Sequence, residues 1–267
     1  MGISYAIKKG LFNSGLEGKL MTTINIPIFI KDFNKENENI SSLNKFLNNF
    51  TDPQMKMKIE NELRYQKCIQ KRLAKVYFIL KNSPVPFYGL HNIRLEYGDN
   101  KSNIDFLIIT NQFCCIINCR NQNGNIEIDS QGRFSRLIKK SEKNLKEGIH
   151  SPVEENSRAE LILKSILNNQ RLEKLPVMSL TVFINSKTTL NFKSCPKDIK
   201  DKVIKINLLN SKIKELVKDT AAAVHEETKA KEVAEILKDL DISLSADHRV
   251  SLKVGLVVKL FQNWTQN

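Results

Sequence analysis

Two neighbouring apolar segments carry polar residues of the kinds that could bind a metal ion and a phosphate group. Asp105 stands at the start of the segment IDFLIIT, and Asn118-Cys119-Arg120 closes the next segment, FCCIINCR. Hydrolysis of a phosphodiester by a metal-activated water needs carboxylates to hold the ion and a cation beside the developing negative charge. Such a site would end its second segment in an acid, any residue and a lysine. This chain has an amide and an arginine there, so the segment is either an active site or only the framework of one.

The segments that would position these residues have the composition of buried strands. IDFLIIT and FCCIINC are dense in apolar and β-branched residues, which is typical of central strands covered on both faces. Only Asn111-Gln112 joins them, and YGDNKSN before them and NQNGN after them have the composition of turns. A run of strands is therefore predicted over residues 91–129.

A long helix is predicted before these strands. Asp52 can cap its first turn, and Pro53 suits the first helical position. Through residues 54–82, apolar side chains recur at close to helical spacing, with basic residues on the other face. The prolines of SPVPFYGL should end this helix, because the residue before a proline avoids helical geometry.

A second helix is predicted after the strands, followed by further strands and helices. Ser151, Pro152 and Glu154 have the order of a capping box at a helix start. LPVMSLTVFIN has the composition of a buried strand and KVIKINLLN of a shorter one, and the chain from there to residue 240 is mainly helical in pattern. The final ISLSADHRVSLKVGLVVKLFQNWTQN fits a strand or a helix equally well. The alternation predicts an α/β core with a mixed sheet.

The stretches FYGLHNIRLEYGDNKSNIDFLIITNQFCCIINCRNQNGNIEID and GIHSPVEENSRAELILKSIL carry a family resemblance. With their hairpin rhythm, the thirteen-residue step from Asp105 to Asn118 and the helix start at Ser151-Pro152, they resemble the NERD (nuclease-related) domain over about residues 65–210. This family is a branch of the restriction-endonuclease-like PD-(D/E)xK superfamily. The resemblance implies a restriction-endonuclease-like mixed sheet flanked by helices and metal-dependent cleavage of phosphodiesters.

The strand residues match the family pattern only in part. Asp105 matches the strand aspartate, but Asn118 stands where the family has glutamate and Arg120 where it has lysine. An asparagine brings no charge to a Mg²⁺ site. Arginine keeps the cation but cannot act as a base, although it could bind a phosphate through two hydrogen bonds. Asn118 and Arg120 could equally be solvated residues at a strand end, and Asp105 a residue that caps one.

The helix residues of the pattern also differ. The family's Gly-Glu on the first helix falls at about Arg72-Leu73, and Glu155 stands where the family has glutamine, with Asn156 and Arg158 keeping that helix start polar. The resemblance therefore implies that a single acid of the expected three, Asp105, is retained. Glu155 could also be an ordinary first-turn acid that interacts favourably with the helix dipole.

Three functions are compatible with these residues. The first is a catalytically degenerate nuclease-fold protein that binds nucleic acid through a basic surface including Arg72, Arg120 and Arg158. The second is a weak nuclease in which Asp105 and Glu155 hold Mg²⁺ or Mn²⁺. The third is a non-catalytic protein that binds a partner or assembles with itself through its terminal extensions.

The composition favours a polyanionic partner. The 42 Lys and Arg residues against 29 Asp and Glu give a formal net charge of +13, which suits phosphate contacts. A lysine- and asparagine-rich composition can also reflect the base composition of a genome. We expect an N-terminal extension (1–52), a NERD-like domain (53–210) and a mainly helical C-terminal extension (211–267), with the extensions as possible surfaces for a homo-oligomer.

Cysteine usage and hydropathy predict a cytoplasmic protein. The five cysteines form an odd set without CxxC spacing, and the four histidines are scattered, so neither a disulfide framework nor a zinc site is expected. The sequence contains no run of about 18 apolar residues, which is the length that a membrane-spanning helix needs. The N-terminus lacks the pattern of a signal peptide.

Overall fold

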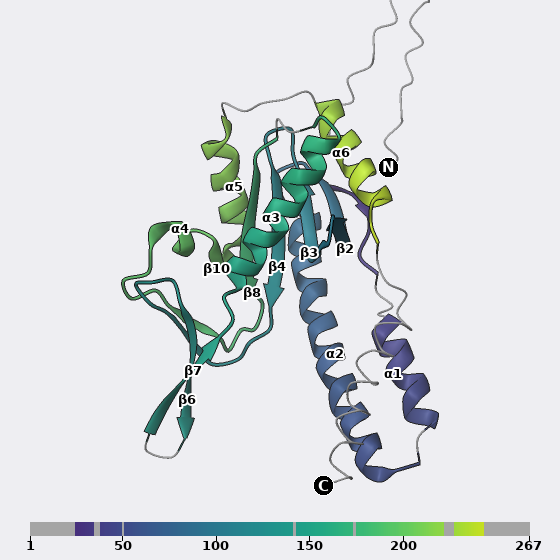
Figure 1. Ribbon diagram of the computed structural model, residues 1–267, viewed down its shortest axis with the longest axis vertical. Helices are drawn as coiled ribbons and strands as arrows, with labels where there is room; N and C mark the ends of the chain where they lie inside the picture. Colours follow the sequence, from purple (N-terminus) through teal and green to yellow (C-terminus); the bar gives the residue numbers. More distant parts are fainter. Residues whose placement is uncertain are drawn as a thin grey trace, which may run out of the picture.

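The computed structural model describes residues 25–34, 38–49, 51–140, 143–172, 175–221 and 227–242. Residues 1–24 of the predicted N-terminal extension lie outside these residues. So does the C-terminal segment that fits either a strand or a helix, apart from its first residue, Ile242. Within them the chain is a mixed α/β protein with two sheets (Figure 1). The predicted α/β class with a mixed sheet is confirmed.

The central sheet has six strands in the order β1-β2-β3-β4-β8-β10. The two hairpins β2–β3 and β3–β4 are antiparallel, whereas β1, β8 and β10 pair in parallel with β2, β4 and β8 respectively. The strands are β1 (Ile28–Lys31), β2 (Tyr88–Tyr97), β3 (Asn100–Ile109), β4 (Cys114–Arg120), β8 (Val177–Phe183) and β10 (Val203–Lys205). Strands β3 and β4 therefore lie in the interior of this sheet, as their apolar composition predicts.

A smaller sheet has four strands in the order β7-β6-β5-β9. Its strands are β5 (Asn125–Ile128), β6 (Phe134–Lys140), β7 (Lys143–Ile149) and β9 (Thr189–Asn191). The β6–β7 hairpin projects away from the central sheet in Figure 1. The sequence did not predict this hairpin, because its segments FSRLIKK and KNLKEGI are mainly polar and basic and do not alternate regularly.

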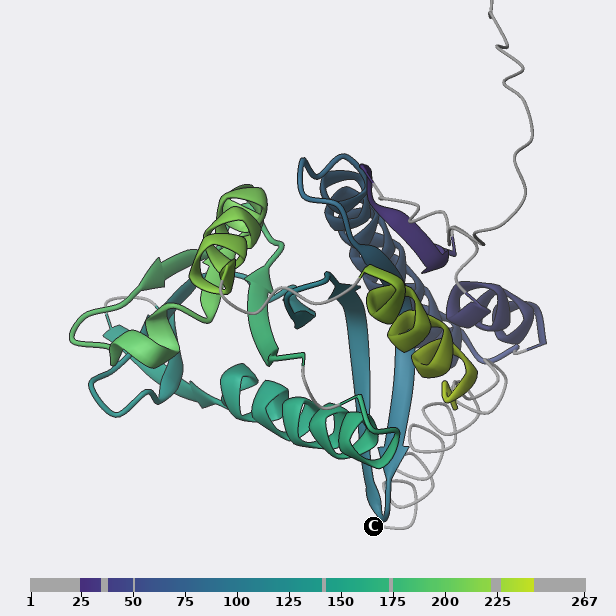
Figure 2. The ribbon, with the colours of Figure 1, turned by 90° about the horizontal axis from the view of Figure 1, so that it is seen from above.

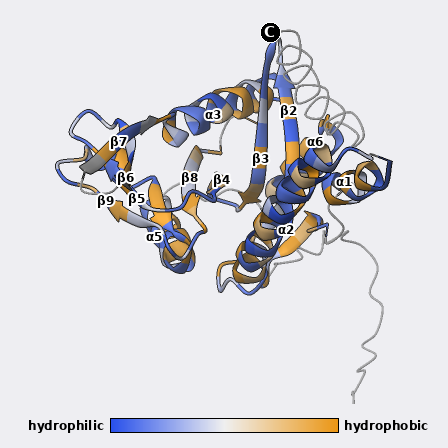
Figure 3. Cartoon of the chain, turned by 90° about the horizontal axis from the view of Figure 1, so that it is seen from below, coloured by the Kyte–Doolittle hydropathy of each residue, from blue (hydrophilic) through white to orange (hydrophobic). Residues whose placement is uncertain are grey.

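Helices cover both faces of the central sheet (Figure 2). Helix α3 (Pro152–Asn169) and helix α6 (Glu227–Asp239) pack on one face, and α2 (Pro53–Lys81) and α5 (Leu209–Asp219) pack on the other. The remaining helices are α1 (Glu38–Asn49), the short α4 (Lys197–Lys200) and a 3₁₀ turn (Ile206–Leu208). Figure 3 shows that these helices carry both hydrophobic and hydrophilic residues, as helices that cover a sheet do.

Helix α2 begins and ends where the sequence predicts. The Asp52 side chain accepts a hydrogen bond from Met55 N at 2.8 Å, and Pro53 occupies the first helical position. The C-terminal half of α2 buries Val76 and Leu80 against the sheet. The N-terminal half runs beyond the sheet and packs on α1 through a separate apolar cluster (Figure 1). Helix α2 thus reaches the end of the sheet at which β4 ends.

The described part of the C-terminal extension shares the cores of the central sheet. Ala230, Val233, Ala234 and Leu237 of α6 are buried with residues of β2 and β3, and Leu209 and Ile213 are buried on the other face. The proposed domain boundaries stay a prediction. No helix among the described residues is long and apolar enough to cross a membrane.

Asp241, just after α6, joins three segments that are far apart in the sequence. Its Oδ1 accepts a hydrogen bond from Arg94 N on β2 at 2.8 Å, and its Oδ2 forms an ion pair with Lys31 of β1. Lys31 Nζ also donates to Asn92 O at 2.6 Å. The carboxylate therefore attaches the end of α6 to the β1–β2 edge of the sheet.

We predict that Asp241→Ala lowers the free energy of unfolding by roughly 2–3 kcal/mol, because the Arg94 N–H loses its acceptor and the Lys31 ammonium group loses its ion pair. Chemical denaturation measures the effect. The matched control is Asp239→Ala, which removes an exposed carboxylate two residues earlier and should change stability by less than about 0.5 kcal/mol. Equal losses in the two variants would contradict the prediction.

Candidate functional site

Asp105 lies at an irregularity in strand β3. The residues on both sides of it pair with β2, but Asn92, which stands opposite, has a φ of 51°. Ile104 packs in the core beneath α3, whereas Phe106 packs in the core beneath α2. In a regular strand, residues two apart lie on the same face. The strand is therefore locally rotated at Asp105, and this places the residue at the end of the sheet where α2 passes.

The Asp105 carboxylate is held by the neighbouring strand. Its Oδ2 accepts a hydrogen bond from Cys119 N at 2.6 Å, and its own backbone N donates to Asn118 Oδ1 at 2.9 Å. Burial raises the pKa of the Asp105 carboxyl above its usual value, and the Cys119 N–H and the charge of Arg120 oppose this rise only in part. The carboxyl keeps a proton to higher pH than an ordinary aspartate does.

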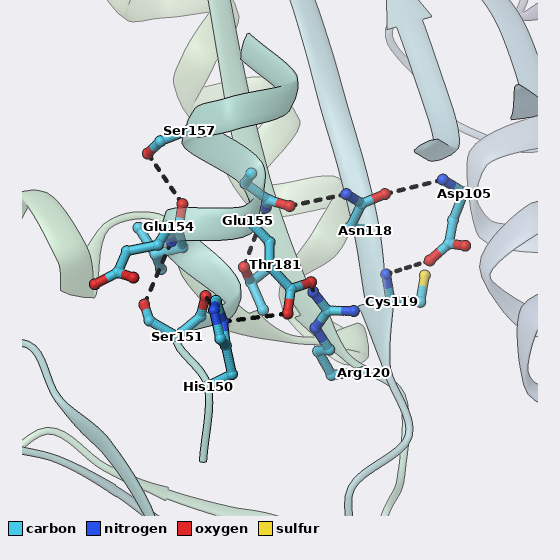
Figure 4. A network of polar contacts seen from close by, with 12 residues as sticks. Asp105, Asn118, Cys119, Arg120, His150, Ser151, Glu154, Glu155, Ser157 and Thr181 are labelled. Carbon is cyan, nitrogen blue, oxygen red and sulfur yellow. Dashed lines mark hydrogen bonds and ion pairs between the residues drawn. The ribbon is translucent and has the colours of Figure 1, made fainter. Parts of the chain in front are cut away.

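Asn118 belongs to a buried chain of neutral hydrogen bonds (Figure 4). Its Nδ2 donates to Asn156 Oδ1 at 2.8 Å, and Asn156 Nδ2 donates to Thr181 Oγ1 at 3.1 Å. All three side chains are buried. This chain of hydrogen bonds joins β4, α3 and β8, and the bond from Asp105 N to Asn118 extends it to β3. Both ends of the Asn118 amide are therefore engaged within the protein.

Arg120 and Glu155 form an ion pair beside this chain. Arg120 Nη2 contacts Glu155 Oε2, and His150 Nδ1 lies 3.4 Å from Glu155 Oε1. The side chains of Arg120 and Glu155 are 24% and 45% exposed. Figure 4 shows Glu155 and Asp105 on different sides of β4. Glu155 thus interacts with two basic side chains rather than with Asp105.

A pocket of about 570 Å³ lies between α2, the middle of β3 and the end of β4. Asp105, Arg120 and Leu73 all line it, so the structure brings these three predicted residues together. The other lining residues are Tyr65, Ile69, Cys119, Asn121, Gln122, Asn123, Arg136 and Ile184. Leu73, at the position where the resemblance places a glutamate, adds an apolar residue to the same pocket as Asp105.

The remaining predicted residues lie outside the pocket lining. Asn118 faces α3 through its bond to Asn156, and Glu155 is held by Arg120 and His150. Arg72 is half-buried on α2, and Arg158 is exposed on α3. The first-turn residue of α3 that reaches Asn118 is therefore Asn156, one position after Glu155.

Sequence reasoning missed several residues of this region. Thr181 stands in an ordinary buried strand, and nothing in its neighbourhood indicates a polar partner. Tyr65 could have been noticed in the sequence, because it is an aromatic residue one helical turn before Ile69 on the predicted long helix. In the structure it is half-exposed. Arg136 comes from the β6–β7 hairpin, which the sequence did not predict. These residues reach the site only through tertiary contacts.

The comparison with protein families matches this same region. Residues 63–184, from within α2 to just after β8, match the model of the nuclease-related domain, NERD. This segment is a nuclease-related domain. It contains Leu73, Asp105, Asn118, Arg120 and Glu155. No curated protein and no solved structure matches the chain.

The residues present do not suit the divalent ion that the resemblance implies. Mg²⁺ prefers several oxygen ligands, normally including carboxylates. Here Asn118 Oδ1 accepts a hydrogen bond from Asp105 N, Glu155 is paired with Arg120 and lies beside His150, and Leu73 offers no ligand. Among the described residues, no group of three or more His, Cys, Asp or Glu side chains could hold a metal ion. Within the described part of the chain, Asp105 is the one acid that lines the pocket.

We predict that Asp105→Asn raises the melting temperature at pH 7. A carboxyl with a raised pKa binds more protons in the folded state than in the unfolded state, so stability falls as pH rises above 3.8. Asparagine keeps the acceptor for Cys119 N and removes the charge. Differential scanning fluorimetry from pH 3 to 8 should show the gap between variant and wild type closing toward low pH. Asp99→Asn, in the exposed β2–β3 turn, is the control and should show no such trend.

Proposed function

We propose that this protein is a catalytically degenerate nuclease-fold protein that binds nucleic acid through a basic surface. The observation that carries the proposal is the neutral Asn118–Asn156–Thr181 chain. Asn118 stands where the resemblance implies a glutamate, and a neutral amide is a weaker ligand for a divalent ion than a carboxylate.

Charge supports nucleic acid as the ligand. The net charge is +13, and two arginines, Arg120 and Arg136, line the pocket. A guanidinium group has five N–H donors, so one carboxylate leaves donors for a phosphate. Arg72 and Arg158, on α2 and α3, are further proposed contacts at the two sides of this end of the sheet.

One prediction of the proposed function concerns the Arg120–Glu155 pair. Arg120→Ala should weaken nucleic-acid binding, and Glu155→Gln should strengthen it, because the second change removes the carboxylate that competes with phosphate for Arg120. Fluorescence anisotropy with labelled DNA at 50 mM salt should show opposite changes of roughly threefold to tenfold. Lys238→Ala, an exposed cation on α6, is the control and should change affinity less than about twofold.

The same assay tests the binding proposal itself. Affinity of the wild type should fall by at least about tenfold between 50 and 200 mM salt, because phosphate binding releases counterions. Absence of binding to DNA and RNA at low salt would remove the main support for the proposal. It would favour a protein that binds a partner or assembles with itself, which light scattering would reveal.

The second prediction concerns cleavage. With Mg²⁺ or Mn²⁺, the wild type should not cut labelled single- or double-stranded DNA or RNA, and Asp105→Ala should behave identically. Metal-dependent cleavage that disappears in Asp105→Ala would instead establish the weak nuclease that uses Asp105 and Glu155. Cleavage that persists in the variant would indicate a contaminant.

The third prediction restores a ligand. Because Leu73 and Asp105 line the same pocket, Leu73→Glu places a second carboxylate in it. We expect Mn²⁺ affinity, measured by isothermal titration calorimetry, to increase at least about tenfold, or ~1.4 kcal/mol. Leu73→Gln introduces a side chain of the same size as glutamate but without its charge, and this variant should not show the gain in Mn²⁺ affinity. Equal affinity in both variants would show that position 73 does not complete a metal site.

We also propose a reduced, cytoplasmic environment, since all five cysteines are free. We further propose, from the sequence alone, that the protein can form a homo-oligomer through its terminal extensions.

A further inference from the structure

The pocket beside Asp105 contains groups that phosphate binding does not use. Tyr65 of α2 lines it and is 51% exposed, which leaves much of its ring accessible. Ile69, Leu73 and Ile184 give the pocket an apolar part. The segment after β4 adds three consecutive amide side chains, at residues 121–123. An aromatic ring, an apolar surface and several amides together suit a flat, polar-edged ligand.

Two of the amides have an unsatisfied oxygen. Asn121 Oδ1 and Gln122 Oε1 are buried, and neither has a hydrogen-bond partner among the described residues. A buried acceptor without a donor costs roughly 1–3 kcal/mol. The backbone of Gln122 is fixed, since its carbonyl accepts a hydrogen bond from Thr188 Oγ1. Both residues line the pocket, so a donor group of a ligand that displaces the atoms covering these oxygens could become their partner.

A nucleic-acid base supplies the matching chemistry. Its face stacks on aromatic rings and packs on apolar side chains, and its edge carries amino and carbonyl groups that amides recognise. Arg120 and Arg136 line the same pocket and would lie near the attached phosphates. The volume of about 570 Å³ is within the range of small-molecule sites.

We propose that this pocket takes one unstacked base of a single-stranded nucleic acid, with Tyr65 stacking on the base and Asn121 and Gln122 bonding to its edge. The inference rests on the proposed nucleic-acid binding and specifies its substrate. A base within a duplex is paired and stacked, and entry would require flipping it out at a cost of a few kcal/mol. The pocket therefore makes the protein selective for single strands over duplexes.

The test compares variants of the full chain by fluorescence anisotropy, with a labelled single-stranded DNA and its duplex at 50 mM salt. Tyr65→Ala should weaken single-strand binding by about tenfold, since stacking on one aromatic is worth roughly 5- to 150-fold. Tyr65→Phe keeps the ring and should stay within about twofold of wild type. Duplex affinity should change less than about twofold in both. Phe78→Ala, another exposed aromatic of α2 (67% exposed) that does not line the pocket, is the matched control.

An oligonucleotide with abasic sites provides the second measurement. The wild type should bind it about tenfold more weakly than the intact strand, and Tyr65→Ala should show a smaller difference between the two strands, because only the contacts of Asn121 and Gln122 with the base remain. Equal binding of the two strands by the wild type overturns the base pocket, and this arm decides the matter even if Tyr65→Ala fails to fold. Wild-type binding that Tyr65→Ala leaves intact also overturns the pocket while the proposed function stands. Failure of the wild type to bind any strand overturns both.

Discussion

The structure of the site depends on the need of buried amide groups for hydrogen-bond partners. Asn118 and Asn156 lie in the interior, where an unpaired polar group is costly. They satisfy each other, and Thr181 and the backbone of Asp105 satisfy the remaining groups. Because these partners come from β3, β4, α3 and β8, the hydrogen-bond chain sets how α3 approaches the end of the sheet. The polar groups of this hydrogen-bond chain are paired with one another, and all of them are neutral.

That neutral chain separates the two faces of the site. On the α3 face, Glu155 stays near the surface and pairs with Arg120 and His150. On the α2 face, Asp105 borders a pocket whose opposite wall is Tyr65, Ile69 and Leu73. The carboxylates of Asp105 and Glu155 are therefore directed to different partners. The pocket is polar and partly aromatic, and two arginines are among its lining residues.

The nuclease-related framework and the pocket are compatible for a physical reason. The matched nuclease-related domain presents strand ends, a helix and the cations Arg120 and Arg136 around the pocket. Asn118 and Leu73 bring no negative charge, so they do not repel phosphates. Both features are compatible with the proposed binding of nucleic acid, and the proposed selectivity for single strands rests on the amides and Tyr65.

Local signals in the sequence account for much of the secondary structure of this protein. Asp52-Pro53 and Ser151-Pro152 mark helix starts, the turns bound the strands, and the spacing of Asp105 and Asn118 sets them as neighbours, because each of these signals acts over a few residues. Tertiary structure alone decided that Asn156 rather than Glu155 reaches Asn118, and that Leu73 rather than Arg72 lines the pocket. A one-residue step turns a helical side chain by about 100°, and the choice between neighbours depends on how the helix packs. The β6–β7 hairpin and Arg136 likewise depend on pairing with β5, which lies outside any local signal.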